Sequence, residues 1–181
     1  MKLKTLLDEV VKKYDYGCAM LYFDCDLTHI HDLIDKDDLY TEQKDNTYGI
    51  ETEPHCTLLY GLHDDVKLND VKTIIDKYKF YDCLASKPSL FQNEKFDVLK
   101  FNVTGNELAQ VNRDLSKLPH TTNYPDYNPH LTIAYLKPGC GQKYVNMLAD
   151  KNFSKYMLKP SHVVYSYPSG KKTKIDINYG Y

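Results

Sequence analysis

The sequence HCTLLY at residues 55–60 recurs as HLTIAY at residues 130–135, and both copies directly follow a proline. The shared pattern is His-x-Thr-apolar-x-Tyr. Chance predicts roughly 0.5 His-x-Thr triplets in this composition, so one copy alone is weak evidence and two matching extended copies are strong evidence. A third triplet, His120-Thr121-Thr122, lies among prolines and polar residues and has no predicted strand to orient it.

Both copies are rich in β-forming residues and predict strands at 55–62 and 130–136. Successive side chains of a strand point to opposite faces, so the histidine and threonine of each copy share one face. Strict alternation places Tyr60 and Tyr135 on the reverse face, in the core. Cys56 also faces the core and lacks a base beside it, so it is not expected to be a nucleophile.

Two such strands facing each other across a groove would flank one small anion with two imidazoles. Phosphodiester transfer needs a base for the attacking oxygen and an acid for the leaving oxygen, and an ordinary histidine pKa of about 6.5 suits both roles. We therefore predict His55 and His130 as the acid/base pair and Thr57 and Thr132 as phosphate ligands. The alternative is that both histidines are ordinary surface residues on half-exposed strands.

The rest of the chain predicts a mixed order of strands and helices without regular βαβ alternation. We therefore expect one α+β domain over residues 1–181, built as two antiparallel-sheet lobes with outer helices around a central cleft. Further strands are predicted at 17–25, 84–91, 96–103, 162–167 and 171–178. Helices are predicted at 1–13, 68–78 and 143–149, and another just after Thr104, where Thr104 and Glu107 have the spacing of a capping box.

Composition limits the classes of partner. With 23 basic and 25 acidic residues the chain has no positive excess for a long nucleic acid, whereas a small nucleotide remains compatible. No stretch has the length or apolarity of a membrane span or a signal peptide. The five cysteines are widely spaced without CxxC, so we expect neither a disulfide framework nor a zinc site, and we expect a reducing cytoplasm as the location.

On its two motifs the sequence resembles the 2H phosphoesterase superfamily, which is defined by two His-x-Thr/Ser-apolar motifs on opposite lobes of a bilobal α+β fold. The resemblance implies His55 and His130 as the catalytic pair and Thr57 and Thr132 as the phosphate ligands. It implies no metal and no other cofactor. It also implies action on 2′,3′-cyclic phosphates, or cleavage of 3′–5′ linkages by a neighbouring 2′-hydroxyl.

Compact size, a lysine-rich composition and YSYPSGKK at residues 165–172 look most like phage anti-CBASS nucleases. That resemblance implies a small cyclic oligonucleotide substrate, a role against CBASS-type antiviral signalling, and the host cytoplasm as the location for a phage-encoded protein. Two alternatives stay open: an RNA-end-processing 2′,3′-cyclic phosphodiesterase, and a protein that sequesters a cyclic nucleotide without turnover.

Four residues outside the motifs are predicted to bind substrate. Tyr22 and Tyr165 are expected to stack on bases, Tyr22 because it alternates onto the more polar side of its strand. Lys137 and Lys171 are expected to attract a negative ligand. The oligomeric state and the order of the two histidines as acid and base do not follow from the sequence.

Overall fold

The computed structural model describes residues 13–43, 45, 47–150 and 156–180, and its centre is a strongly curved antiparallel sheet. The strands of this sheet are β1 (Gly17–Asp24), β2 (His55–Leu62), β4 (Cys83–Gln92), β5 (Asp97–Thr104), β6 (His130–Leu136), β7 (Tyr156–Ser166) and β8 (Lys172–Asp176). Their order is β1-β2-β6-β5-β4-β7-β8, and β7 also pairs with β1, so the sheet closes on itself. The predicted helix over residues 1–13 lies outside the described residues except for Lys13.

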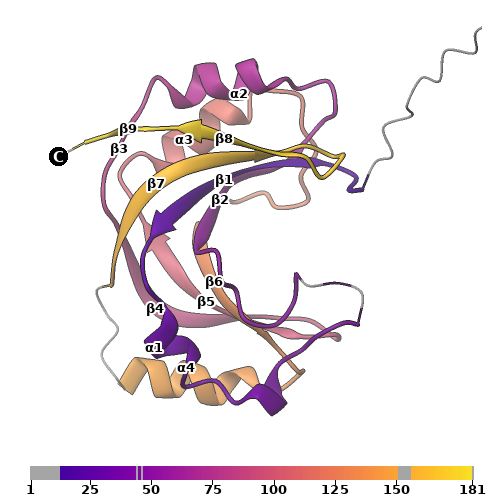
Figure 1. Ribbon diagram of the computed structural model, residues 1–181, viewed down its shortest axis with the longest axis vertical. Helices are drawn as coiled ribbons and strands as arrows, with labels where there is room; N and C mark the ends of the chain where they lie inside the picture. The colour runs from indigo at the N-terminus through magenta and orange to yellow at the C-terminus, as the bar shows by residue number, and fades with distance from the viewer. Residues whose placement is uncertain (1–12, 44, 46, 151–155, 181) are drawn as a thin grey trace, which may run out of the picture.

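The sheet divides into two lobes. The first lobe is β8-β7-β1-β2 and the second lobe is β6-β5-β4. Among the described residues they join where Cys56 of β2 pairs with Leu131 of β6, and where the beginning of β7 pairs with β4. Figure 1 shows the strands bending between two groups of helices, one at each end of the molecule. The α+β fold class with two antiparallel lobes is thereby confirmed.

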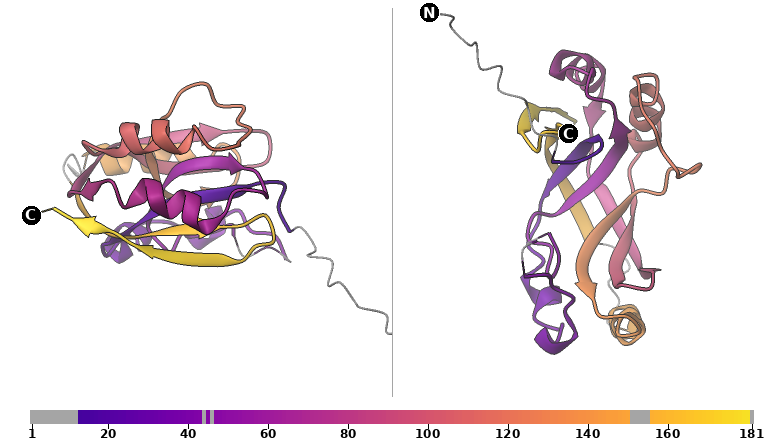
Figure 2. Two further views of the ribbon diagram at one scale, coloured as in Figure 1. Left: turned by 90° about the horizontal axis from the view of Figure 1, so that it is seen from above. Right: turned by 90° about the vertical axis from the view of Figure 1, so that its right-hand side faces the viewer.

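The helices cover the outer ends of the lobes. They are α1 (Thr28–His31), α2 (Leu68–Ile75), α3 (Leu108–Leu115) and α4 (Gly141–Asp150), together with a 3-10 helix η1 (Lys36–Asp38). α2 and α3 lie side by side on the first lobe, and α3 contacts β2 (Figure 2), whereas α4 packs on β4 and β5. Among the described residues no helix is both long and apolar enough to cross a membrane.

The predicted helices follow the 3.6-residue period of their apolar side chains. α2 buries Val71, Ile74 and Ile75, and this stripe faces the core while the polar positions between them stay outside. α3 begins close to its predicted start, but the capping box predicted for Thr104 and Glu107 is wrong. The Glu107 carboxylate is buried and accepts a hydrogen bond from the backbone N–H of Tyr81 at 3.2 Å.

β7 is longer than the strand predicted over 162–167, because it begins at Tyr156. Pro160 lies within the added part, and proline normally ends a strand because it has no N–H to donate. Here the pairing of β7 with β1 shifts between Tyr22 and Phe23, and Phe23 then pairs with Pro160. The irregularity accommodates the proline, so one long strand pairs with β1 of the first lobe and with β4 of the second lobe. A two-stranded parallel sheet of β3 (Lys79–Phe80) and β9 (Asn178–Tyr179) was not predicted.

Each motif strand contains one extra residue within its motif. In β2, Thr57 pairs with Met20 and Leu59 with Ala19, so Leu58 is inserted. In β6 the pairing with β5 skips Ile133 in the same way, between Thr132 and Ala134. A bulge of this kind moves every following side chain to the other face of the strand.

The predicted core positions of Tyr60 and Tyr135 are therefore wrong. Both tyrosines lie on the same face as the histidine and threonine of their own motif, and Tyr60 is 46 % exposed. The two bulges occupy the same motif position, so the internal likeness of the two copies extends to their backbone.

Candidate active site

The two motifs meet at the junction of the lobes. Cys56 pairs with Leu131 in an antiparallel register, so the flanking positions place His55 opposite Thr132 and Thr57 opposite His130. Cys56 and Leu131 are fully buried, whereas all four flanking residues are partly exposed. Because alternate side chains share a face, two imidazoles and two hydroxyls converge on one side of this junction.

Both imidazoles are held in the same way. Nδ1 of His55 lies 2.7 Å from the carbonyl oxygen of Glu53, and Nδ1 of His130 lies 2.9 Å from the carbonyl oxygen of Asn128. A carbonyl oxygen only accepts hydrogen bonds, so Nδ1 carries the proton in each ring. Each Nε2 is thereby left to take or give a proton, which is the arrangement that a general acid/base pair needs.

The two rings have different electrostatic surroundings. Burial lowers the pKa of His130, and the positive charges of Lys100 and His55 lower it further against the opposing effect of the Asn128 carbonyl. His55 instead has a carboxylate beside it, because Oε2 of Glu51 lies 3.9 Å from its Nδ1.

Cys56 is placed as predicted and is unsuited to nucleophilic chemistry. Its side chain is fully buried, and burial raises the pKa of its thiol to about 12. A thiol that stays protonated at neutral pH is a poor nucleophile.

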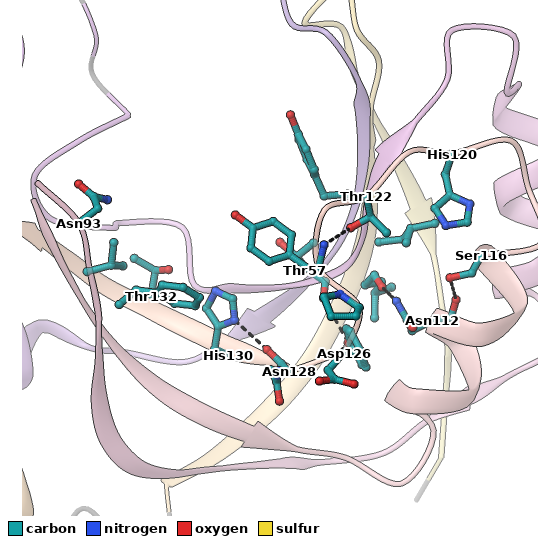
Figure 3. Close-up of a pocket in the computed structure, with 18 of the residues that line it drawn as sticks. Thr57, Asn93, Asn112, Ser116, His120, Thr122, Asp126, Asn128, His130 and Thr132 are labelled. Atoms are coloured by element: carbon teal, nitrogen blue, oxygen red, sulfur yellow. Dashed lines mark hydrogen bonds between the residues drawn. The ribbon is translucent and has the colours of Figure 1, made fainter. Parts of the chain in front are cut away.

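A pocket of about 780 Å³ opens next to the junction, and Thr57, His130 and Thr132 are among its lining residues (Figure 3). His55 is not part of that lining, since its ring stacks on Tyr22 instead. Tyr60 and Tyr135 also line the pocket, from opposite directions, because β2 and β6 run antiparallel away from the Cys56 and Leu131 pair. The pocket thus extends to both sides of the four motif residues.

Loop and helix side chains replace strand pairing where β2 and β6 separate. The hydroxyl of Tyr127 donates to the carbonyl of Thr57 at 3.2 Å, and Nδ2 of Asn112 donates to the carbonyl of Leu58 at 2.7 Å. Buried carbonyl groups need such partners. The two side chains therefore give partners to carbonyl groups of β2 just beyond its pair with β6.

The segment 119–128 borders the pocket outside the regular strands. Its His120 pairs with Leu62 only through an isolated bridge, and its Nδ1 lies 2.9 Å from the carbonyl oxygen of Leu118. His120 and Thr122 line the pocket away from His130 (Figure 3). This third triplet therefore lacks the strand that presents the other two.

Of the four predicted substrate-binding residues, the structure brings Tyr22 to the site. It pairs with His55, and its ring stacks between His55 at 5.2 Å and His162 at 5.1 Å. Only 8 % of Tyr22 is exposed, and burial raises the pKa of its hydroxyl to about 12. Its ring contacts His55, whereas its contact with a ligand stays a prediction.

Tyr165 is fully buried, and its hydroxyl donates to the carbonyl of Val66 at 2.9 Å. The prediction that Tyr165 contacts a ligand is therefore corrected, because a side chain without exposed surface serves the core. The pairing of β7 with β1 and β8 is regular from His162 to Ser166, so Tyr165 shares its face with the fully buried Val163.

The two predicted lysines lie away from the motif residues. Lys137 follows β6, five positions beyond Thr132, and its Nζ donates to the carbonyl of Asp37 at 2.6 Å. Lys171 is exposed in the turn between β7 and β8, where its Nζ lies 5.8 Å from the centroid of the Tyr167 ring. Neither lines the pocket, so the structure does not bring them to the site.

Three residues that the sequence did not single out stand beside the motifs. Lys100 pairs with Thr132 across β5 and β6, and the ring of Phe91 lies 6.3 Å from that of His130 and is 49 % exposed. Asn102 pairs with His130. The alternation of polar residues in β5 was the signal for Lys100 and Asn102, but only the strand pairing shows that they lie beside β6.

Among the described residues no group of three or more His, Cys, Asp or Glu side chains is placed to hold a metal ion. No protein-family model matches the sequence, and no curated protein matches it.

Solved structures do match. Usb1 of Kluyveromyces marxianus with uridine monophosphate is 13 % identical, with a TM-score of 0.58 over 90 % of this chain and 98 % of that chain. A phosphoesterase and E. coli LigT complexed with NADP+ are each 12 % identical over 90 % of this chain and 95 % of theirs, with TM-scores of 0.45 and 0.44. At such identities the likeness to Usb1 establishes the fold alone. That fold is the α+β fold of the 2H phosphoesterases, as the resemblance implied.

Proposed function

We propose that the protein is a phosphodiesterase in which His55 and His130 exchange protons with the two oxygens of one phosphodiester. One observation carries this proposal: Cys56 pairs with Leu131, which sets both imidazoles and both threonine hydroxyls around one point. The threonines donate to the non-bridging oxygens of the phosphate, where negative charge grows in the transition state.

The proposed reaction begins with the 2′-hydroxyl beside the scissile phosphate. Its oxygen attacks phosphorus while Nε2 of one histidine takes its proton. The bond from phosphorus to the 5′-oxygen of the next nucleoside breaks, and Nε2–H of the other histidine protonates that oxygen. The products are a 2′,3′-cyclic phosphate and a free 5′-hydroxyl. Water then hydrolyses the cyclic phosphate with the proton roles reversed.

We assign the base of the first step to His130 and the acid to His55. Burial and the positive charge of Lys100 favour the neutral ring at His130. The carboxylate of Glu51 lies 3.9 Å from Nδ1 of His55, so a negative charge faces this imidazole. The base of the first step must be neutral, and the surroundings of His130 favour that form.

The proposed substrate is a cyclic oligonucleotide second messenger cleaved at its 3′–5′ linkages, which would counter CBASS-type antiviral signalling. The shape of the pocket supports a linkage with a nucleoside on each side. Tyr60 and Tyr135 line it in opposite directions from the motif residues, and aromatic side chains stack on bases with little regard to sequence. The resemblance of the motifs and of residues 165–172 to phage anti-CBASS nucleases supports a cyclic oligonucleotide as the substrate.

Incubation with a panel of cyclic di- and trinucleotides in the presence of EDTA tests the proposal. We expect linear products, their loss in His55→Ala and in His130→Ala, and no cleavage of 2′-deoxy analogues. His29→Ala is the control, because His29 is exposed on α1. Equal cleavage of a 2′-deoxy substrate would exclude attack by the 2′-hydroxyl.

The same panel separates the alternatives. An RNA with a terminal 2′,3′-cyclic phosphate, opened while the cyclic oligonucleotides stay intact, would indicate an RNA-end-processing enzyme. Recovery of bound but unchanged ligand after long incubation would indicate sequestration without turnover.

A further inference from the structure

Lys100 lies one strand away from the paired motifs, on their face of the sheet. It pairs with Thr132, and the next residue of β5 on that face, Asn102, pairs with His130. Side chains of directly paired residues stand side by side. The structure therefore places a lysine beside the proposed phosphate ligand Thr132.

The ammonium group of Lys100 has only neutral partners. Nζ donates to Oγ of Ser89 at 3.0 Å and to Oδ1 of Asn102 at 3.4 Å, and it lies 5.5 Å from the centroid of the Phe91 ring. In the part of the chain that the structure describes, Lys100 forms no ion pair. In contrast, Lys72 forms an ion pair with Asp76, and Lys117 forms an ion pair with Asp114.

This environment is costly for a cation. The Lys100 side chain is partly buried, and burial lowers the pKa of its amine. A charge withdrawn from water without a counter-ion destabilises the protein, and an arriving anion relieves that cost. The ion that fits is one that binds on the same face, between the two motifs.

We propose that Lys100 is a further catalytic residue that binds a non-bridging oxygen of the scissile phosphate, on the side of Thr132 and opposite Thr57. The inference rests on the proposed function, because it takes the junction of the motifs as the phosphate site. Strands are about 4.8 Å apart, and a lysine side chain spans more than that distance. Nζ is hydrogen-bonded to Ser89 and Asn102. By turning away from these two residues it would reach the junction.

Lys100 also acts on His130 through its charge. The positive charges that face His130 are those of Lys100 on β5 and His55 on β2, and both lower its pKa. One lysine then binds the phosphate and keeps the neighbouring imidazole neutral, which suits the role of base. A lysine that only supported the fold would not affect phosphate binding.

Lys100→Met, Lys100→Arg and the control Lys72→Met on α2 test the proposal. The substrate is a dinucleoside monophosphate, which has a single phosphate, so a role at a more distant phosphate cannot produce the effect. For Lys100→Met we expect kcat/KM to fall about 10- to 100-fold, the range for a lost hydrogen bond to a charged group. Lys100→Arg should recover most of that loss, and Lys72→Met should behave as the wild type.

Two measurements do not depend on turnover. NMR titration of the imidazoles should show a higher pKa for His130 in Lys100→Met, and inorganic phosphate should bind that variant at least about 10-fold more weakly than the wild type. Thermal stability should be unchanged or higher in Lys100→Met, since an unpaired partly buried cation has been removed, so unfolding would not explain the losses.

The outcomes separate the two proposals. Equal phosphate affinity and equal kcat/KM in Lys100→Met and the wild type would overturn the role of Lys100 and leave the proposed function standing. A wild-type protein that neither binds phosphate nor cleaves any diester would overturn both.

Discussion

Substitution of Gly61 by alanine should displace the segment that holds His130. Gly61 has a φ of +103°, and a Cβ built on it would lie 1.9 Å from the carbonyl oxygen of Thr121. Real Cβ contacts are essentially never below 3.0 Å, so the backbone must move apart by about 1 Å. That segment continues to Asn128, whose carbonyl fixes Nδ1 of His130. A misplacement of about 1 Å at a catalytic group costs up to roughly 10²-fold in rate.

Gly139→Ala is the matched control. Gly139 also has a positive φ, of +80°, but its Cβ would have no neighbour within 4 Å. Both variants should lose about 1–2 kcal/mol from the left-handed backbone of a non-glycine residue. Only Gly61→Ala should lose more than this in urea denaturation and also lose activity on a cleavable diester. Equal stability and equal activity in the two variants would show that the contact with Thr121 does not position the site.

Two further predictions concern buried groups. Tyr165→Phe removes the hydrogen bond to Val66 and should lower the free energy of unfolding by about 1 kcal/mol without changing kcat/KM; a large rise in KM would instead restore Tyr165 as a ligand contact. Because the pKa of His130 is lowered in the folded protein, the unfolded chain takes up its proton first as the pH falls through about 6.5. The free energy of unfolding should therefore decrease from pH 7.5 to pH 5.5, and decrease less in His130→Asn, as urea titrations at the two pH values would measure; an equal decrease in both proteins would contradict the lowered pKa.

The sequence by itself determined the two motif strands and suggested the chemistry proposed for them. The bounds predicted for β2 and β6 agree with the structure, because runs of β-forming residues after a proline are local signals. Alternation correctly placed each histidine beside its threonine, since only two positions separate them. The 3.6-residue period likewise identified α2 and the helix after Thr104.

Local signals failed wherever a partner strand set the geometry. The bulges at Leu58 and Ile133 turned Tyr60 and Tyr135 toward the pocket, and alternation cannot reveal an inserted residue. Two consecutive apolar residues before each tyrosine were the available sign. The burial of Tyr165 likewise depends on what packs against β7 from far along the chain.

The tertiary structure alone decided which residues surround the proposed phosphate site. Lys100 comes beside Thr132 through the pairing of β5 with β6, and the two motifs meet through Cys56 and Leu131, 75 positions apart in the chain. Between bulges, alternation in the sequence specifies which side chains share a strand face, because that depends on neighbours two residues away. It does not specify which strands become neighbours, because that depends on how the whole set of buried faces packs together.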